Sequence, residues 1–214
     1  MVDAVTVEFG VKALLTLFVV IDPVGLVPWF ATLTGGRSPA EQATIARRAV
    51  LIAATVLLFF AVAGGPLLAY LGISVAALQI AGGLLLFRIA VDMVFAQLRR
   101  ETAEEEAEAR AREDVSVFPL AIPLIAGPGA LASILILASE TRGEPGPFGV
   151  VLAMAALVLL VAYLFLRISA HFARFLGQTG INVVTRVLGL VLAALAVQYV
   201  VDGLIGLGLP LGGG

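Results

Sequence analysis

The chain has 214 residues, of which 61% are hydrophobic and only 13% are charged, whereas ordinary soluble domains carry about a quarter charged residues. A mean hydropathy of +1.10 agrees with this, and a soluble protein of this composition could not cover its surface with polar groups. A net charge of −2 argues against a nucleic-acid partner, and the absence of cysteine excludes disulfides and thiolate metal sites.

Six apolar runs follow one another along the chain and predict six membrane spans. Each is long enough to cross about 30 Å of hydrocarbon. They must be helices, because lipid offers no water to satisfy an open backbone. The predicted spans lie at about 11–34, 49–71, 75–97, 116–139, 148–168 and 183–207. The sequence therefore predicts an all-α, polytopic membrane protein that forms a single transmembrane domain over residues 1–214.

Basic residues gather in every second loop, which predicts the orientation of the chain. Short cytoplasmic loops carry an excess of Lys and Arg. The loops after the first, third and fifth runs hold Arg37, Arg47, Arg48, Arg99, Arg100, Arg110, Arg112, Arg167 and Arg174, and the other side holds only Lys12 and Arg142. We expect both termini on the outer, periplasmic side of the cell inner membrane. The segment Arg99–Asp114, also rich in glutamate, is predicted to be a solvated cytoplasmic helix.

The two halves of the chain resemble each other weakly. Asp22-Pro23-Val24-Gly25 in the first run corresponds to Gly127-Pro128-Gly129-Ala130 in the fourth, 105 residues further on. Gly83–Leu86 corresponds to Gly189–Leu192 with an offset of 106. We expect repeats at about 8–98 and 115–208, joined by the loop 99–114. Three spans per repeat would insert the second copy upside down, as in inverted-repeat transporters.

Prolines and glycines interrupt the first and fourth runs in their middles. Asp is a good N-cap and Pro suits the first helical position, so Asp22 and Pro23 predict the start of a half-helix, as Gly127 and Pro128 do. Exposed N–H groups at such a start attract anions. We expect a midplane substrate site formed by Asp22, Pro23, Val24, Gly25, Ala126, Gly127, Pro128 and Gly129. The alternative is a pair of proline kinks that only shape the packing.

Other polar residues within the spans are candidates for ion coupling or gating, together with Asp22. Arg88 and Asp92 are four residues apart and can form an ion pair, or snorkel to the membrane surface. Arg186 can neutralise Asp22 or a substrate carboxylate, or anchor to headgroups. Gln198 and Asp202 share one helical face. The sequence contains no nucleophile–base constellation and no phosphate loop, so we expect no enzyme, no cofactor and no metal site.

These interrupted runs resemble the signatures of a known family. The first signature is Ile21–Phe30 and the second, very specific one is Pro119–Ala130; Arg186–Leu190 and Val197–Gly203 also match. On these residues the chain is identified as a member of the MarC family. The resemblance implies a six-span inner-membrane protein, similar to SnatA transporters of small neutral amino acids and to the LysE exporter group. Most relatives carry Asn where this chain has Asp22.

The expected function is secondary transport of glycine or alanine by alternating access, with the proton as the favoured coupling ion and sodium as the alternative. The substrate carboxylate would meet the helix starts at Val24–Gly25 and Gly129–Ala130. Its ammonium group would meet Asp22 or carbonyl groups near Ile125 and Ala126. The expected partners are this substrate, the ion and the lipid bilayer. A homo-oligomer is also compatible with the sequence. The rival functions are an exporter of other small metabolites or drugs, a passive channel, a membrane scaffold and an intramembrane enzyme.

Overall fold

The computed structural model describes residues 4–95 and 115–209, and the regular elements in these ranges are helical. The first range holds α1 (Ala4–Ile21), α2 (Leu26–Leu33), α3 (Pro39–Tyr70) and α4 (Val75–Phe95). The second holds η1 (Ser116–Ile125), α6 (Pro128–Glu140), α7 (Pro145–Arg167) and α8 (Ser169–Gly206). The predicted helix at Arg99–Asp114 lies outside the described residues.

Four helices are long and apolar enough to cross a membrane, namely α3, α4, α7 and the part of α8 from Thr179 to Gly206. Two further pairs reach that length only together: α1 with α2, bent by 41°, and η1 with α6, bent by 54°. Counting each bent pair as one span raises the number of candidate spans to six. The predicted all-helical, multi-pass membrane protein with interruptions in the first and fourth runs is confirmed at this level.

Two helices begin well before their predicted starts. α3 starts at Pro39 instead of 49, because Ser38 and Glu41 form a capping box: the Ser38 N–H donates to the Glu41 carboxylate (2.8 Å) and the Glu41 N–H to the Ser38 hydroxyl (3.4 Å). The hydrogen bond from the Ser38 hydroxyl lowers the pKa of Glu41. α8 starts at Ser169 instead of 183, and bends at Gly177 (φ 63°) before its apolar part. Hydropathy marks only the apolar part of each helix, so it misses the polar turns before it.

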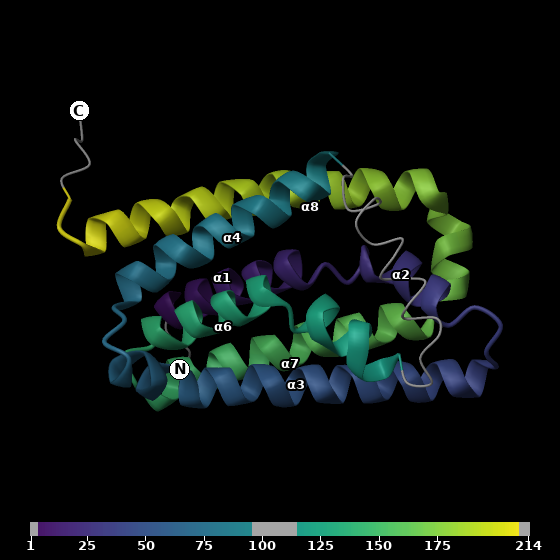
Figure 1. Cartoon of the computed structure of the whole chain (residues 1–214), viewed down its shortest axis with the longest axis horizontal. Coiled ribbons are helices and arrows are strands. Elements are labelled where there is room, and N and C mark those ends of the chain that lie inside the picture. Colours follow the sequence, from purple (N-terminus) through teal and green to yellow (C-terminus); the bar gives the residue numbers. More distant parts are fainter. Residues whose placement is uncertain (1–3, 96–114, 210–214) are drawn as a thin grey trace.

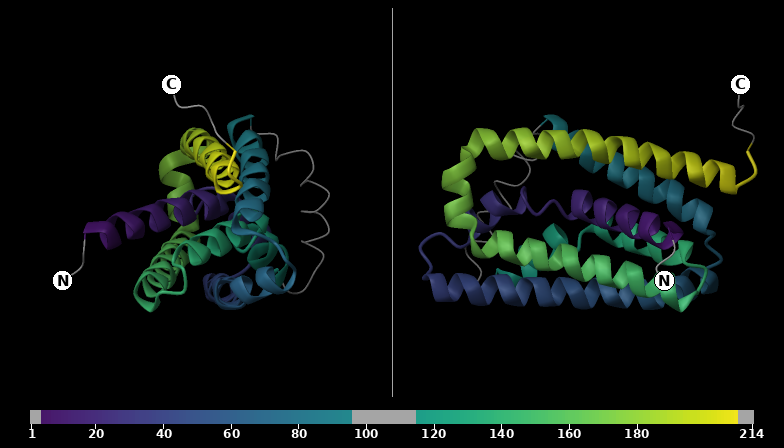
Figure 2. Two further views of the ribbon diagram at one scale, coloured as in Figure 1. Left: turned by 90° about the vertical axis from the view of Figure 1, so that its left-hand side faces the viewer. Right: turned by 180° about the vertical axis from the view of Figure 1, so that it is seen from behind.

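α4 and α8 lie side by side along one flank of the bundle, while α3 and α7 form the opposite flank (Figures 1 and 2). Glycines allow the two backbones to approach. A Cβ at Gly83 would lie 2.6 Å from the Ala196 carbonyl oxygen, and one at Gly189 would lie 3.2 Å from the Ala90 carbonyl oxygen. Outward-facing side chains such as Leu190, 68% exposed, are apolar, as a lipid-facing surface requires.

The two ends of the bundle differ in what they contain. α1 begins and α8 ends at one end, which we call the terminal end (Figure 1). The α2–α3 loop and the turn from α7 into α8 lie at the other end, which we call the basic end. Arg37 lies in that loop, Arg47 and Arg48 lie near the start of α3, and Arg167 ends α7.

Candidate functional site

The break between α1 and α2 is built around Asp22. Asp22 adopts a left-handed backbone conformation (φ 46°), which Asp and Asn tolerate better than other side chains. Its carboxylate accepts a hydrogen bond from the Gly25 N–H at 3.0 Å, and its carbonyl accepts one from the Leu26 N–H at 3.1 Å. The predicted start of the half-helix at Asp22 and Pro23 is wrong, because α2 begins at Leu26 with Gly25 as its N-cap.

The backbone N–H groups at the start of α2 therefore already donate hydrogen bonds within the protein. The Val27 N–H donates to the Val24 carbonyl at 3.2 Å, in addition to the two bonds that Asp22 accepts. A substrate carboxylate would have to displace these internal partners to bind at Val24 and Gly25. The polar group that this break offers a ligand is the second oxygen of the Asp22 carboxylate, Oδ2, for which no hydrogen bond is found in the described structure.

A cavity of about 570 Å³ lies beside this break. Its wall combines both sides of the first break with the last turns of α4 and the first apolar turns of α8. It is lined by Val20, Ile21, Asp22, Gly25, Leu26, Pro28, Trp29, Thr32, Ile89, Asp92, Met93, Leu124, Ile181, Asn182, Thr185 and Arg186. The volume lies in the range of small-molecule sites, about 300–1,000 Å³. Because α2 and these parts of α4 and α8 lie toward the basic end, the cavity belongs to that half of the bundle.

Three ionisable groups line the cavity, and they differ in how they are paired. The Asp92 carboxylate accepts from the Arg88 guanidinium at 3.2 Å, so the predicted Arg88–Asp92 ion pair is confirmed; Arg88 itself is 68% exposed and does not line the cavity. No ion pair joins Asp22 to Arg186 in the part of the chain that the structure describes. Asp22 and Arg186 thus line the same cavity without an ion pair between them.

The second break is locally as predicted but does not reach the cavity. Gly127 is the extended N-cap of α6 and Pro128 takes its first position. A Cβ added at Gly129 would lie 2.9–3.2 Å from side-chain atoms of Ile89, Leu86 and Val20, so these side chains cover this side of Gly129. Of the residues predicted for the site, the structure brings Asp22, Gly25, Asp92 and Arg186 to the cavity, but not Pro23, Val24, Ala126, Gly127, Pro128 or Gly129. Leu124, two residues before this break, lines the cavity instead.

Sequence reasoning missed two polar residues of α8, Asn182 and Thr185. The Thr185 hydroxyl is buried and has no hydrogen-bond partner in the described structure. With Arg186 they share one face of the helix, because residues three and four apart are neighbours there. The spacing of these three polar residues at the start of an apolar run is the sequence pattern from which this polar face could have been predicted.

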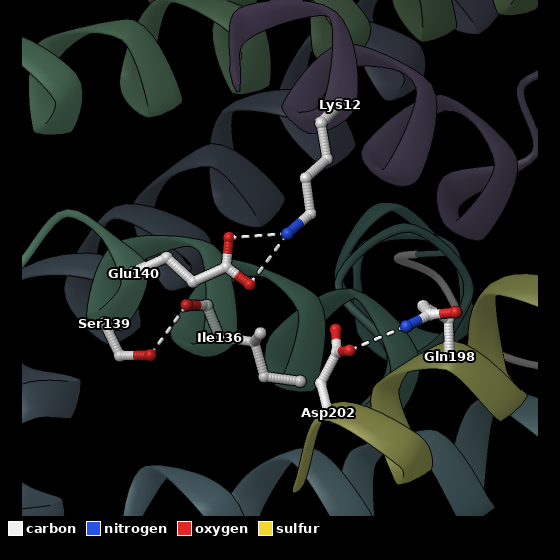
Figure 3. A network of polar contacts seen from close by, with 6 residues as sticks. All are labelled: Lys12, Ile136, Ser139, Glu140, Gln198 and Asp202. Carbon is white, nitrogen blue, oxygen red and sulfur yellow. Dashed lines mark hydrogen bonds and ion pairs between the residues drawn. The ribbon is translucent and has the colours of Figure 1, made fainter. Parts of the chain in front are cut away.

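The last predicted pair lies away from the cavity, near the terminal end. Gln198 donates to the Asp202 carboxylate at 2.7 Å, so their predicted common face is confirmed (Figure 3). Neither residue lines the cavity. Among the described residues, no group of three or more His, Cys, Asp or Glu side chains is placed to hold a metal ion.

Comparison with known proteins places similar sequences in bacteria and archaea. The family model described as "MarC family integral membrane protein" matches residues 7–207. A UPF0056 membrane protein of Archaeoglobus fulgidus is 40% identical over 198 residues, 92% of each chain. The UPF0056 membrane protein YvbG of Bacillus subtilis is 38% identical, over 94% of this chain and 96% of that protein. The UPF0056 inner membrane protein YhgN of Escherichia coli is 33% identical, over 91% and 95%. No solved structure matches the chain significantly.

Proposed function

Since the chain belongs to the MarC family of integral membrane proteins, we propose that it is a secondary transporter of small neutral amino acids, of the glycine and alanine class. The observation that carries the proposal is the cavity beside the first broken span, with Asp22 on one wall and Arg186 on another. Broken helices with a ligand-sized cavity at the break are typical of transporter substrate sites.

The charges of the cavity fit a zwitterion. The ammonium group of an amino acid would donate to the Asp22 carboxylate, of which one oxygen holds the Gly25 N–H. The carboxylate would accept from the Arg186 guanidinium, a planar donor suited to this geometry. Asn182 and Thr185, one turn before and beside Arg186, supply polar groups to the same carboxylate. In this arrangement the substrate carboxylate binds to α8, and not to the helix start at Val24–Gly25 that the sequence predicted.

The proposed mechanism, alternating access, would use an inverted repeat. Gly83 faces the carbonyl of Ala196, and Gly189 faces the carbonyl of Ala90. An offset of 106 converts each of these contacts into the other, since Gly83 corresponds to Gly189 and Ala90 to Ala196. α3 and α7 also begin at prolines 106 residues apart, Pro39 and Pro145. We propose that a twofold axis in the membrane plane passes between α4 and α8.

The proposed orientation rests on the arginines of the basic end. Arginines near the α2–α3 loop and at the end of α7 favour the cytoplasm for that end, and hence both termini outside the cell membrane. The cavity then represents an inward-facing state. The proton is the proposed coupling ion because Asp22 is a carboxylate within a span that can bind and release one; sodium is the alternative.

The decisive experiment uses the purified protein in liposomes preloaded with unlabelled alanine. We expect counterflow of labelled alanine and glycine well above that of liposomes without the protein. When an inward proton gradient is applied, we expect the labelled amino acid to accumulate. An inward sodium gradient serves as the rival drive. The cavity is larger than alanine, so its volume alone does not explain a preference for small amino acids. Leucine is therefore the informative competitor: weak competition with labelled alanine indicates that the closed state is narrower than this cavity. Absence of movement above empty liposomes under both gradients would exclude the proposal.

Arg186 gives a specific prediction for substrate recognition. Replacing it with glutamine removes a charge-assisted hydrogen bond worth about 1.5–3 kcal/mol, so the alanine concentration for half-maximal counterflow should rise about tenfold to a hundredfold. Arg186→Lys keeps the charge but loses the planar fork, and we expect an intermediate value. Arg142→Gln, exposed in the turn after α6, is the matched control. Half-saturation unchanged in Arg186→Gln would remove Arg186 from the site.

A further inference from the structure

Polar side chains that the cavity does not use gather in the other half of the bundle, toward the terminal end. The Lys12 ammonium group of α1 donates to both carboxylate oxygens of Glu140 at the end of α6, at 2.7 and 2.9 Å (Figure 3). This ion pair ties the terminal halves of the two broken spans together. Its side chains are partly accessible, at 41% for Lys12 and 21% for Glu140.

Hydroxyl groups lie on the inner side of this ion pair. Thr16 is buried one turn further along α1. Ser133 lies about two turns before Glu140 on the same face of α6, and its buried hydroxyl has no hydrogen-bond partner in the described residues. The buried Tyr199 hydroxyl of α8 is near Thr16, but the two do not meet hydrogen-bond geometry. Tyr199 belongs to one buried cluster with Val19 of α1 and Ile136 of α6, so its side chain lies among residues of both broken spans.

The repeat relates this group to the wall of the cavity. Pro28 corresponds to Ser133 with the offset of 105 that relates the two breaks. Met93 corresponds to Tyr199 with the offset of 106 that relates α4 to α8. Pro28 and Met93 line the cavity in the basic half; Pro28 is half-buried whereas Ser133 is fully buried, but Met93 is buried as Tyr199 is. At the Pro28–Ser133 pair, equivalent positions of the proposed repeat thus differ in exposure, more open beside the cavity and closed in the other half of the bundle.

We propose that Thr16, Ser133 and Tyr199 line the outer half of the transport pathway in its closed state, and that the Lys12–Glu140 ion pair is its gate. The proposal rests on the proposed function. Burying a hydroxyl without a partner is costly, and that cost is removed when water enters the open pathway. In the outward-facing state Lys12 and Glu140 separate, and the three hydroxyls become hydrated.

The absence of cysteine makes the test direct, because a single introduced thiol is the only one in the chain. The probe is a charged, membrane-impermeant methanethiosulfonate added outside right-side-out vesicles, and the measured quantity is the labelling rate of Ser133→Cys. We expect slow labelling in the parent background and a rate up to about fivefold higher with Glu140→Gln, as the loss of one partly exposed ion pair predicts. Lys12→Gln, which removes the other partner, should have the same effect.

Controls separate the gate from unfolding and from the transport proposal. The charge exchange Lys12→Glu with Glu140→Lys should restore slow labelling. Arg142→Cys, exposed beside the gate, should label rapidly in every background, and Ala53→Cys, fully buried in α3, should not label in any. Equal rates for Ser133→Cys with and without the ion pair, or no labelling in any background, would overturn the gate. Labelling needs no substrate, so this result is independent of whether alanine is transported.

Discussion

The Asp22→Asn variant is expected to fold as the parent protein does and to lose proton-driven accumulation of alanine, while retaining slow counterflow. Asparagine tolerates the left-handed conformation of this residue, and its side-chain oxygen can still accept the Gly25 N–H. It cannot bind a proton or balance an ammonium charge. Losing that charge should raise the alanine concentration for half-maximal counterflow about tenfold or more. The measurement is accumulation of labelled alanine in liposomes with and without an inward proton gradient.

Two further variants distinguish the charge of Asp22 from its structural role. Asp22→Ala removes the hydrogen bond to Gly25 as well, and the strained backbone then costs about 1–3 kcal/mol, so loss of activity there is ambiguous. Gly25→Ala keeps the carboxylate but moves it, because the new Cβ would overlap the Asp22 side chain. We expect Gly25→Ala to lose transport as well. If Asp22→Asn accumulates alanine as the parent does, Asp22 carries no coupling proton.

The comparison of the two breaks shows what local sequence can predict. At Gly127 and Pro128 the expected N-cap and first position are correct, because proline fixes its own φ and offers no N–H. At Asp22 the same reasoning fails, although the break itself is real. The side chain of Asp22 satisfies the Gly25 N–H, and the helix therefore restarts three residues after Pro23, at Leu26. The sequence around Asp22 is compatible with a helix that starts at Pro23 and with one that starts at Leu26, because the Asp22 side chain can accept from a backbone N–H in either case.

The composition of the cavity could not be predicted from local patterns. The interruptions indicated where the backbone departs from a helix, and Asp22 and Gly25 do line the cavity. Which other helix faces them depends on packing between distant segments. The structure brings Asn182 and Thr185 of α8 to the same cavity as the first break, whereas Gly129 of the second break packs against α4. The proposed repeat would relate the two breaks by symmetry, but it would not require them to meet at one ligand.

Gly83→Val is expected to destabilise the protein more than any substitution within the cavity. A Cβ at this position would lie 2.6 Å from the Ala196 carbonyl oxygen and 3.1 Å from the Val200 nitrogen, so the obstruction is backbone and cannot rotate away. α4 and α8 would have to separate along their common face. Overpacking of this kind costs about 3 kcal/mol, and a chain of this size should lose about 6–12 °C in melting temperature. Circular dichroism in detergent during heating measures the loss.

The matched control is Gly65→Ala in α3, where the added Cβ meets no atom within 4 Å. There only helix propensity changes, and we expect stabilisation of up to about 1 kcal/mol. Gly189→Ala, whose Cβ would lie 2.8 Å from the Met93 side chain and 3.2 Å from the Ala90 carbonyl, should fall between the two. Because Gly83 and Gly189 make equivalent contacts across the proposed axis, an added side chain should destabilise the protein more at either of them than at Gly65. If Gly83→Val melts at the same temperature as the parent protein, α4 and α8 are not closely packed at Gly83, and the proposed repeat loses its strongest supporting contact.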